Sequence, residues 1–197
     1  DTKEKIENNA KVVKKDFKGE IVFKDVWFAY NEPTFVLKGI NFSLSPGETV
    51  AFVGATGAGK SSVINLLSRF YEYQKGEIIV DGDELRDIDV DLIRKNVAVV
   101  LQDVFLYSDT VLNNITLGDT SISRETVIEA SKQVGAHEFI MSLPENYDFV
   151  VGERGGMLSV GQRQLISFIR AYVYNPSILI LDEATSSIDT ESEELIQ

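Results

Sequence analysis

The chain of 197 residues contains no cysteine and a single histidine, His137. The lack of cysteine excludes disulfides and thiolate metal sites, and it fits a reducing compartment. A histidine-rich metal site is excluded in the same way. We expect His137 to have a structural or surface role rather than a catalytic one. The chemistry of this chain must therefore come from other groups.

Basic residues are also scarce, with 19 Lys and Arg against 31 Asp and Glu, a net charge of −12. Such a charge disfavours binding of nucleic acid over a broad surface. No apolar run approaches the roughly 20 residues of a membrane helix, and no signal peptide opens the sequence. Hydrophobic content of 44% and charged content of 25% are ordinary for a globular protein. The length suits one domain with room for a small subdomain.

What the sequence does contain is a glycine-rich stretch at 54–61, GATGAGKS, which matches the phosphate-loop pattern G-x-x-x-x-G-K-[ST], called Walker A. Glycines let the backbone curl round a polyphosphate and turn its N–H groups toward the oxygens. The pattern predicts that Lys60 reaches the β- and γ-phosphates and that the Ser61 hydroxyl ligates Mg²⁺. We expect a strand over Glu48–Val53 and a helix over Ser61–Phe70. These flanks disfavour the alternative of a flexible glycine turn that matches by chance.

A second group of residues lies near the end of the chain, where the apolar run Ile178–Leu181 is followed directly by Asp182 and Glu183. In a P-loop enzyme Asp182 can hold Mg²⁺ through water, and Glu183 can orient the attacking water. Alone this signal is weak, because many strands end in polar turns. Together with a complete phosphate loop upstream, it indicates a nucleotide hydrolase.

The rest of the chain predicts an α/β fold with a P-loop core, a mostly parallel sheet, an N-terminal antiparallel β-layer and an α-helical subdomain at about 103–170. Residues 1–18 are polar and lack glycine and proline, so we expect a linker there. The remaining domain would cover 19–197. The expected elements after residue 20 are β-runs at 21–30 and 37–44, strands at 76–80, 97–101 and 178–181, and helices at 90–96, within 108–143 and at 158–174. The runs at 97–101 and 178–181 are apolar throughout, as in strands buried on both faces.

The stretch Leu158-Ser159-Val160-Gly161-Gln162 resembles the LSGGQ signature of ABC ATPases, with Val160 in place of a glycine. Tyr30 matches the aromatic A-loop residue that stacks on adenine, and Gln102 matches the Q-loop. Residues 186–189 resemble the D-loop, and 151–155 resemble the ERG segment of exporter-type domains. The resemblance runs from about residue 20 to the end. The chain therefore resembles the nucleotide-binding domain of an ABC exporter, without the membrane domain that precedes it in such proteins.

This resemblance implies that two such domains pair head to tail, as a homodimer or heterodimer, with each ATP between the Walker A loop of one and the signature of the other. It implies ATP and Mg²⁺ as cofactors, a transmembrane domain as partner, no nucleic acid, and a place at the cytoplasmic face of the cell membrane. The implied catalytic residues are Glu183, Lys60 and Gln102, and the implied metal-site residues are Ser61, Gln102 and Asp182. The implied nucleotide contacts are Tyr30, Gly54, Thr56, Gly57, Ala58, Gly59, Lys60, Ser61, Ser62, Ser159, Gly161 and Gln162.

The sequence also departs from the family pattern. The family's switch histidine follows the D-loop, and this chain ends at Gln197 before reaching it. The resemblance therefore implies a C-terminally truncated domain that binds ATP but hydrolyses it weakly. Phe149 and Val150 stand where exporters carry a Thr-Glu pair, which puts that contact to the membrane domain in doubt. Val160 keeps its backbone N–H, so contact with phosphate through the signature is still expected.

Two other kinds of ABC protein are alternatives. One is a soluble ABC-type ATPase that acts on DNA or ribosomes. The DNA-repair versions carry a very long coiled-coil insertion between Q-loop and signature, whereas here Gln102 and Leu158 are only 56 residues apart. A non-hydrolysing regulatory domain is the other possibility. Glu183 argues against it, because degenerate sites often lose that base, and Val160 argues mildly for it.

Overall fold

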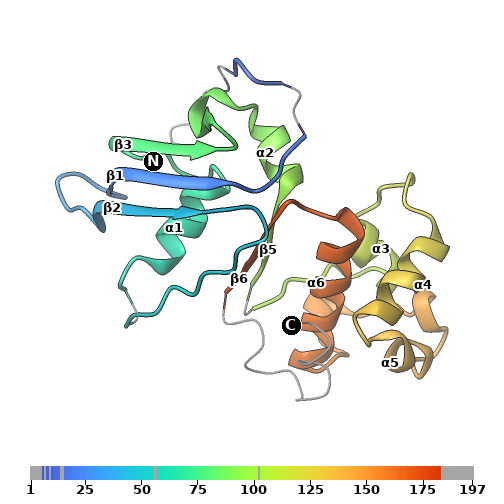
Figure 1. Cartoon of the computed structure of the whole chain (residues 1–197). Helices are drawn as coiled ribbons and strands as arrows, with labels where there is room; N and C mark the ends of the chain where they lie inside the picture. Colours follow the sequence, from blue (N-terminus) through green and yellow to red (C-terminus); the bar gives the residue numbers. More distant parts are fainter. Residues whose placement is uncertain are drawn as a thin grey trace. The chain divides into compact units, whose positions relative to one another are not determined.

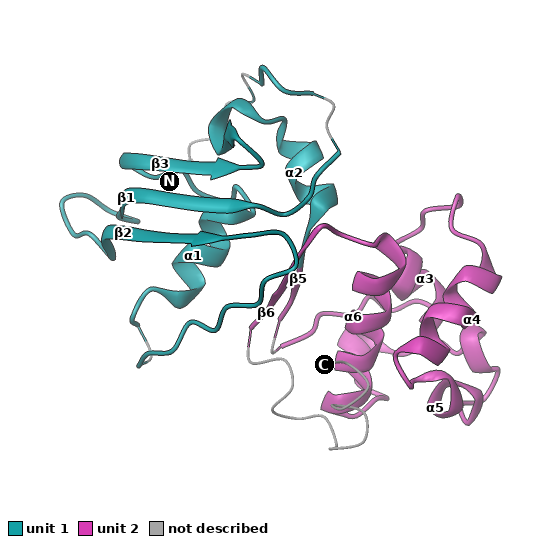
Figure 2. Cartoon of the chain, viewed as in Figure 1, with its two compact units in different colours: residues 1–98 teal, residues 99–197 magenta. Residues whose placement is uncertain are grey.

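A computed structural model describes residues 6, 8, 10–13, 16–55, 57–101 and 103–182 (Figure 1). The chain divides into two compact units, unit 1 over residues 1–98 and unit 2 over residues 99–197 (Figure 2). Within the described residues, no helix combines the length and apolar character that crossing a bilayer requires.

Unit 1 is built on a four-stranded antiparallel sheet in the order β2–β1–β3–β4 (Figure 1). In the central strand β1, Phe23 pairs with Phe42 of β2 on one side and with Ile78 of β3 on the other. The predicted N-terminal antiparallel layer is confirmed, and it is extended by two further strands. The strand bounds are Ile21–Phe28 for β1, Leu37–Leu44 for β2, Lys75–Val80 for β3 and Asp83–Glu84 for β4.

A bulge lets β1 keep one face in the core along its whole length. Ile21, Phe23, Val26 and Phe28 are all buried, although their spacing changes from two residues to three and back to two. The extra residue falls at Asp25, whose φ is 46° and where the register with both neighbours shifts. Because a bulge adds one residue without crossing the sheet, the apolar set stays on one side. The two β-runs expected over 21–30 are therefore one strand.

The helix after the glycine loop, α1, spans Lys60–Leu67. Val63, Leu66 and Leu67 are buried at the i, i+3, i+4 spacing that gives a helix one apolar face. The helix is shorter than the predicted 61–70, because Arg69 takes a left-handed φ of 48°. The guanidinium of Arg69 is buried there and donates to the carbonyl of Ile88 at 2.5 Å. Unit 1 continues with η1 (Leu85–Asp87) and α2 (Val90–Asn96), the latter with the predicted bounds.

The strand predicted over 48–53 is not observed, although the structure describes all six residues. These residues have no assigned strand, and Val50, Phe52 and Val53 are 46%, 44% and 95% exposed. The ring of Phe52 packs edge-on against Phe42, with centroids 5.2 Å apart. The reason is that an apolar run makes a strand only when a neighbouring backbone pairs with its N–H and C=O groups.

The N-terminal segment is held at two places in unit 1: the N–H groups of Lys11 and Val12 donate to the carbonyl of Asp87, and the residues just before β1 bond to one carboxylate. The backbone N–H groups of Lys18, Gly19 and Glu20 donate to Asp81 at 2.8, 3.3 and 2.9 Å. Asp81 also donates its own N–H to the carbonyl of Glu20 at 2.9 Å. This clamp holds the entry to β1 against the turn that ends β3. The assignment of 1–18 as a linker stays a prediction.

The described residues also form a two-stranded parallel sheet, β5–β6, whose first strand begins at the end of unit 1, and the described part of unit 2 holds four α-helices (Figure 1). The α/β class, with an antiparallel and a parallel sheet, is confirmed. Burial of β6 on both faces is not observed, since Leu179 and Leu181 are 50% and 44% exposed. In the described residues β6 has one neighbouring strand, so the sheet is too small to bury both faces. The bounds are Val97–Val100 for β5, Val111–Thr116 for α3, Arg124–Gln133 for α4, His137–Met141 for α5, Val160–Tyr174 for α6 and Ile178–Leu181 for β6.

Three α-helices of unit 2 begin at side-chain caps, whereas α5 begins at Ala136 without one. Thr110, Ser123 and Ser159 each accept a hydrogen bond from a backbone N–H three residues later, at the starts of α3, α4 and α6. The guanidinium of Arg170 on α6 donates twice to the carbonyl of Asn114 on α3, at 2.9 and 2.8 Å. These bonds fix α3 against α6.

Candidate nucleotide-binding site

The glycine loop in unit 1 has the backbone that the phosphate-loop pattern requires. Gly57 and Gly59 have φ values of 84° and 94°, a region that residues with a Cβ rarely adopt. A Cβ on Gly59 would also lie 2.7 Å from Cδ2 of Leu37 on β2. Both the conformation and the space therefore demand glycine at position 59.

The loop leads directly into the start of α1, which no side chain caps. Gly59 is the N-cap residue, without a side-chain hydrogen bond, and the first turn holds no acidic residue. The first N–H groups of such a helix, together with its dipole, favour an anion. Ser61 is exposed in this first turn, where its hydroxyl is accessible to a ligand. The loop and helix start thus suit a phosphate group.

Lys60 supplies the positive charge of this site. Its ammonium donates to the loop carbonyls of Gly54 and Ala55, with Nζ–O distances of 2.6 and 3.3 Å. These bonds hold the lysine side chain back across its own loop. Phosphate oxygens are charged acceptors and form stronger bonds with an ammonium than carbonyls do. The arrangement therefore keeps the cation where an anion in the loop could take it over.

Tyr30, the predicted adenine-stacking residue, lies beside α1 in the same unit. Its hydroxyl is 3.1 Å from Oγ of Ser62 and accepts a hydrogen bond from Nδ2 of Asn65 at 2.9 Å. Its ring meets Phe28 and Tyr71 edge-on, at centroid distances of 4.7 and 4.9 Å. The tyrosine remains 42% exposed. Sequence reasoning missed Asn65, and the only available signal was its position three residues after Ser62 on one helix face.

The signature-like residues lie in unit 2, at the start of α6. The Ser159 hydroxyl accepts from the N–H of Gln162 at 3.2 Å, and Oε1 of Gln162 accepts from the N–H of Ser159 at 2.9 Å. This reciprocal pair is a capping box. Val160 is the first helical residue and is 46% exposed, so its side chain does not enter the core. The N–H groups of Val160 and Gly161 belong to the first turn, which the two cap bonds leave open.

The predicted metal and catalytic residues are only partly described. Asp182 follows β6 in unit 2, where its N–H donates to the carbonyl of Val100 at 3.0 Å. Ser61 belongs to unit 1, so each of the two residues is described within its own unit. Thr56, Gln102 and Glu183 lie outside the described residues, as does the D-loop at 186–189.

No cluster of three or more acidic or histidine side chains able to hold a metal occurs within the described ranges. Magnesium often uses only one or two protein ligands and takes the rest from phosphates and water. A serine hydroxyl at the start of α1, beside a phosphate loop, fits that mode. The residues present therefore suit Mg²⁺ brought with a nucleotide rather than a metal site made by the protein alone.

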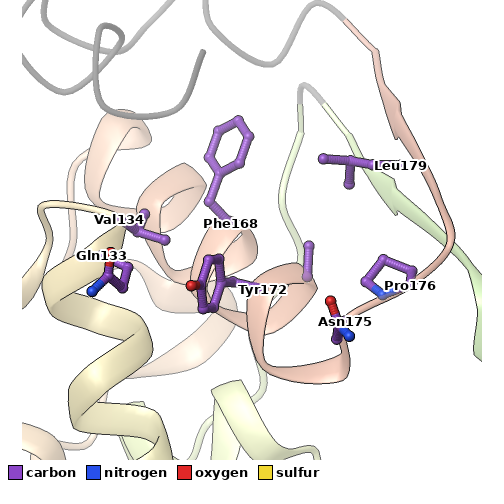
Figure 3. A pocket seen from close by; sticks show the side chains of 8 residues that line it. Gln133, Val134, Phe168, Tyr172, Asn175, Pro176 and Leu179 are labelled. Atoms are coloured by element: carbon purple, nitrogen blue, oxygen red, sulfur yellow. The ribbon is translucent and has the colours of Figure 1, made fainter. Parts of the chain in front are cut away.

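A cavity of about 280 Å³ in unit 2 contains none of the predicted site residues. Figure 3 shows Phe168 and Tyr172 projecting from α6 on one side, with Leu179 of β6 across from them. Among the described residues, no charged side chain lines this cavity. A triphosphate would need cations or free N–H groups. This cavity is therefore not the nucleotide site. The lining residues are Gln133, Val134, Phe168, Ala171, Tyr172, Asn175, Pro176 and Leu179.

The contacts of His137 are those of the structural residue expected from the sequence. Its Nδ1 lies 2.8 Å from the hydroxyl of Tyr147, and burial raises the pKa of that tyrosine. Nearby, the guanidinium of Arg124 donates two hydrogen bonds to Asp148 and lowers the pKa of this carboxylate. These groups join α4 and α5 to the segment that follows them.

A loop of left-handed glycines, an uncapped helix start and a lysine held over the loop form the arrangement of a P-loop nucleotide-binding domain. The family model described as ABC transporter matches residues 37–186, more than half of the chain. The chain belongs to the ABC transporter family, and it is an ATP-binding domain of the exporter type.

Several known proteins are similar to this chain, two in sequence and one in fold as well. The chain is 50% identical over 180 residues to a Staphylococcus aureus protein named "Putative multidrug export ATP-binding/permease protein", covering 91% of this chain and 31% of that protein. It is 49% identical over 179 residues to the Bacillus subtilis protein YknV, named an uncharacterized ABC transporter ATP-binding protein, covering 91% of this chain and 30% of that one. A bacterial Atm1-family ABC exporter solved with ATP bound matches with a TM-score of 0.86 and 39% identity, over 91% of this chain and 32% of that one. The chain thus spans about a third of the length of these relatives.

Proposed function

We propose that this chain binds MgATP through the loop at 54–61 and the start of α1. The observation that carries the proposal is the loop geometry, in which Gly59 can bear no side chain and Lys60 lies across the carbonyls of Gly54 and Ala55. The backbone N–H groups would receive the phosphates, and Lys60 would exchange its carbonyl partners for phosphate oxygens. Tyr30 would provide the face on which adenine stacks. The ATP bound in the Atm1-family exporter supports the same ligand here.

Hydrolysis is proposed to use residues of both units and of a second domain. Ser61 and Asp182 would hold Mg²⁺ with Gln102, and Glu183 would orient the attacking water. In a head-to-tail dimer, the start of α6 of the second domain would face the γ-phosphate. Its open first turn, with the N–H groups of Val160 and Gly161, supports that role because a helix N-terminus favours an anion.

ATP binding and hydrolysis would then power export through a transmembrane partner. The names of the relatives, which combine ATP-binding with permease or exporter parts, support this proposal. The chain would lie at the cytoplasmic face of the membrane. Closure of the dimer on ATP would switch the membrane partner between its two access states.

The test of this function is calorimetric titration of the chain with MgATP, followed by sedimentation of Glu183→Gln with and without ATP. We expect saturable binding of one ATP per chain, and an ATP-dependent dimer in the variant that cannot hydrolyse it. Glu183→Asp is the matched control, because it keeps the charge and shortens the side chain. No binding at millimolar MgATP would contradict the proposal, and binding without any dimer would contradict its head-to-tail part.

A further inference from the structure

We infer that Asn65 is a positioning residue for adenine, which it serves by fixing the ring of Tyr30 to the phosphate-loop helix. The inference rests on the proposed function, because it assumes that ATP occupies this site. It adds a residue outside the glycine loop and outside the residues predicted from the sequence. Asn65 would touch the tyrosine and not the nucleotide.

The geometry is a short chain of hydrogen bonds. Nδ2 of Asn65 donates to the hydroxyl oxygen of Tyr30 at 2.9 Å, and this hydroxyl can in turn donate to Oγ of Ser62 at 3.1 Å. Ser62 and Asn65 are three residues apart on α1, and side chains at this spacing lie on one face of a helix. Two side chains on one face of α1 therefore form hydrogen bonds with the hydroxyl of Tyr30.

The rest of the tyrosine is held by its neighbours. Phe28 and Tyr71 contact its ring at interplanar angles of 77° and 89°. With the hydroxyl fixed by α1 and the ring packed against two aromatic neighbours, the side chain has little rotational freedom left. A residue ordered before binding lowers the entropy that the ligand must overcome. Tyr30 is thus preorganised as a platform while still 42% exposed.

The position of these hydrogen bonds on α1 relates them to nucleotide binding. Ser62 lies in the first turn of α1, directly after Lys60 and Ser61. The same turn would receive the phosphates at one end of the nucleotide and hold the adenine platform at the other. The Asn65–Tyr30–Ser62 link therefore sets the separation between the base subsite and the phosphate subsite. It also implies that the tyrosine hydroxyl matters, although stacking alone would need only the ring.

The test compares affinities for MgATP and for magnesium tripolyphosphate, which has the phosphates without the base. Asn65→Ala removes the donor without weakening the helix, since alanine favours helix more than asparagine does. We expect this variant to bind MgATP about two- to tenfold more weakly, the effect of one hydrogen bond, and to bind tripolyphosphate as the parent does. Tyr30→Phe should cause a loss of similar size. Asn31→Ala, which changes an exposed neighbour of Tyr30, is the matched control and should bind both ligands normally.

A double variant shows whether Asn65 and the hydroxyl of Tyr30 act together on MgATP affinity or independently. If Asn65 acts through the tyrosine hydroxyl, Asn65→Ala should add nothing in a Tyr30→Phe background. Additive losses would overturn the inference. So would unchanged MgATP affinity in Asn65→Ala, or an equal loss for MgATP and tripolyphosphate, which would indicate a merely structural role. A parent chain that binds neither ligand would instead overturn the proposed function.

Discussion

Replacing Lys60 by alanine removes the only cation in the glycine loop, and its effect on binding can be estimated from the contacts that the lysine makes. In the structure the ammonium holds two carbonyl oxygens, of Gly54 and Ala55. On binding MgATP it would exchange them for β- and γ-phosphate oxygens. Hydrogen bonds to charged groups are worth about 1.5–3 kcal/mol each. Allowing for the carbonyl bonds given up, we estimate a net loss of about 3–4 kcal/mol, or roughly 100- to 1,000-fold in affinity.

The fold itself should tolerate this change. Both carbonyls that lose the ammonium belong to exposed loop residues, so water can replace it. We therefore expect the free energy of unfolding of Lys60→Ala to stay within about 0.5 kcal/mol of the parent. This separation of binding from stability is what makes the variant informative.

Calorimetric titration with MgATP and thermal unfolding would measure the two quantities on the same samples. Lys38→Ala, which removes an exposed lysine of β2, is the matched control and should bind as the parent does. Lys60→Arg should retain part of the affinity, because it keeps the charge but changes its shape. Affinity of Lys60→Ala within about threefold of the parent would refute the assignment of the loop as the phosphate site, since 3 kcal/mol corresponds to far more.

Three further results are expected. Gly59→Ala should lower stability by about 1–3 kcal/mol and weaken MgATP binding, because its Cβ would lie 2.7 Å from Leu37 and its φ is 94°; chemical denaturation and titration would check both, and a neutral result would contradict the loop geometry. Ser159→Ala should cost about 1 kcal/mol by removing the cap of α6, whereas Ser159→Asp should not; equal unfolding midpoints for all three chains would count against the cap. Arg124→Ala should raise the pKa of Asp148 toward its usual value of 3.8, measured by NMR titration. Because the folded pKa is lowered, the pair stabilises the fold above about pH 4 and loses this contribution as the pH falls through the lowered pKa; an unchanged titration would contradict the pairing.

Local signals in the sequence predicted much of the secondary structure. Helix α2 and strand β6 have their predicted bounds, because caps and turns mark their ends within a few residues. The prediction of a strand over 48–53 was wrong because a strand there depends on a partner elsewhere in the chain. Its composition carries β-propensity, but propensity is a statement about packing against neighbours.

The candidate site, like the secondary structure, could be predicted only in part. The glycine loop and Lys60 were predictable, because one contiguous pattern encodes both the backbone conformation and the charge. The bond between Asn65 and Tyr30 was not, since it joins residues 35 positions apart and depends on how β1 and α1 pack. The roles of Thr56, Gln102 and Glu183 remain predictions from the family resemblance.

The clamp at Asp81 has a mechanical consequence for the chain that enters β1. A pull along the N-terminal segment would load the three N–H bonds at Lys18, Gly19 and Glu20 before it reached the strand. Because they converge on one carboxylate beside β3, force would pass into the centre of the sheet and not peel away its first residue. The bonds that Lys11 and Val12 donate to the carbonyl of Asp87 lie further toward the N-terminus and would be loaded first. The Asp81 carboxylate is thus a second attachment, which would protect the first residues of β1 after the earlier one had given way.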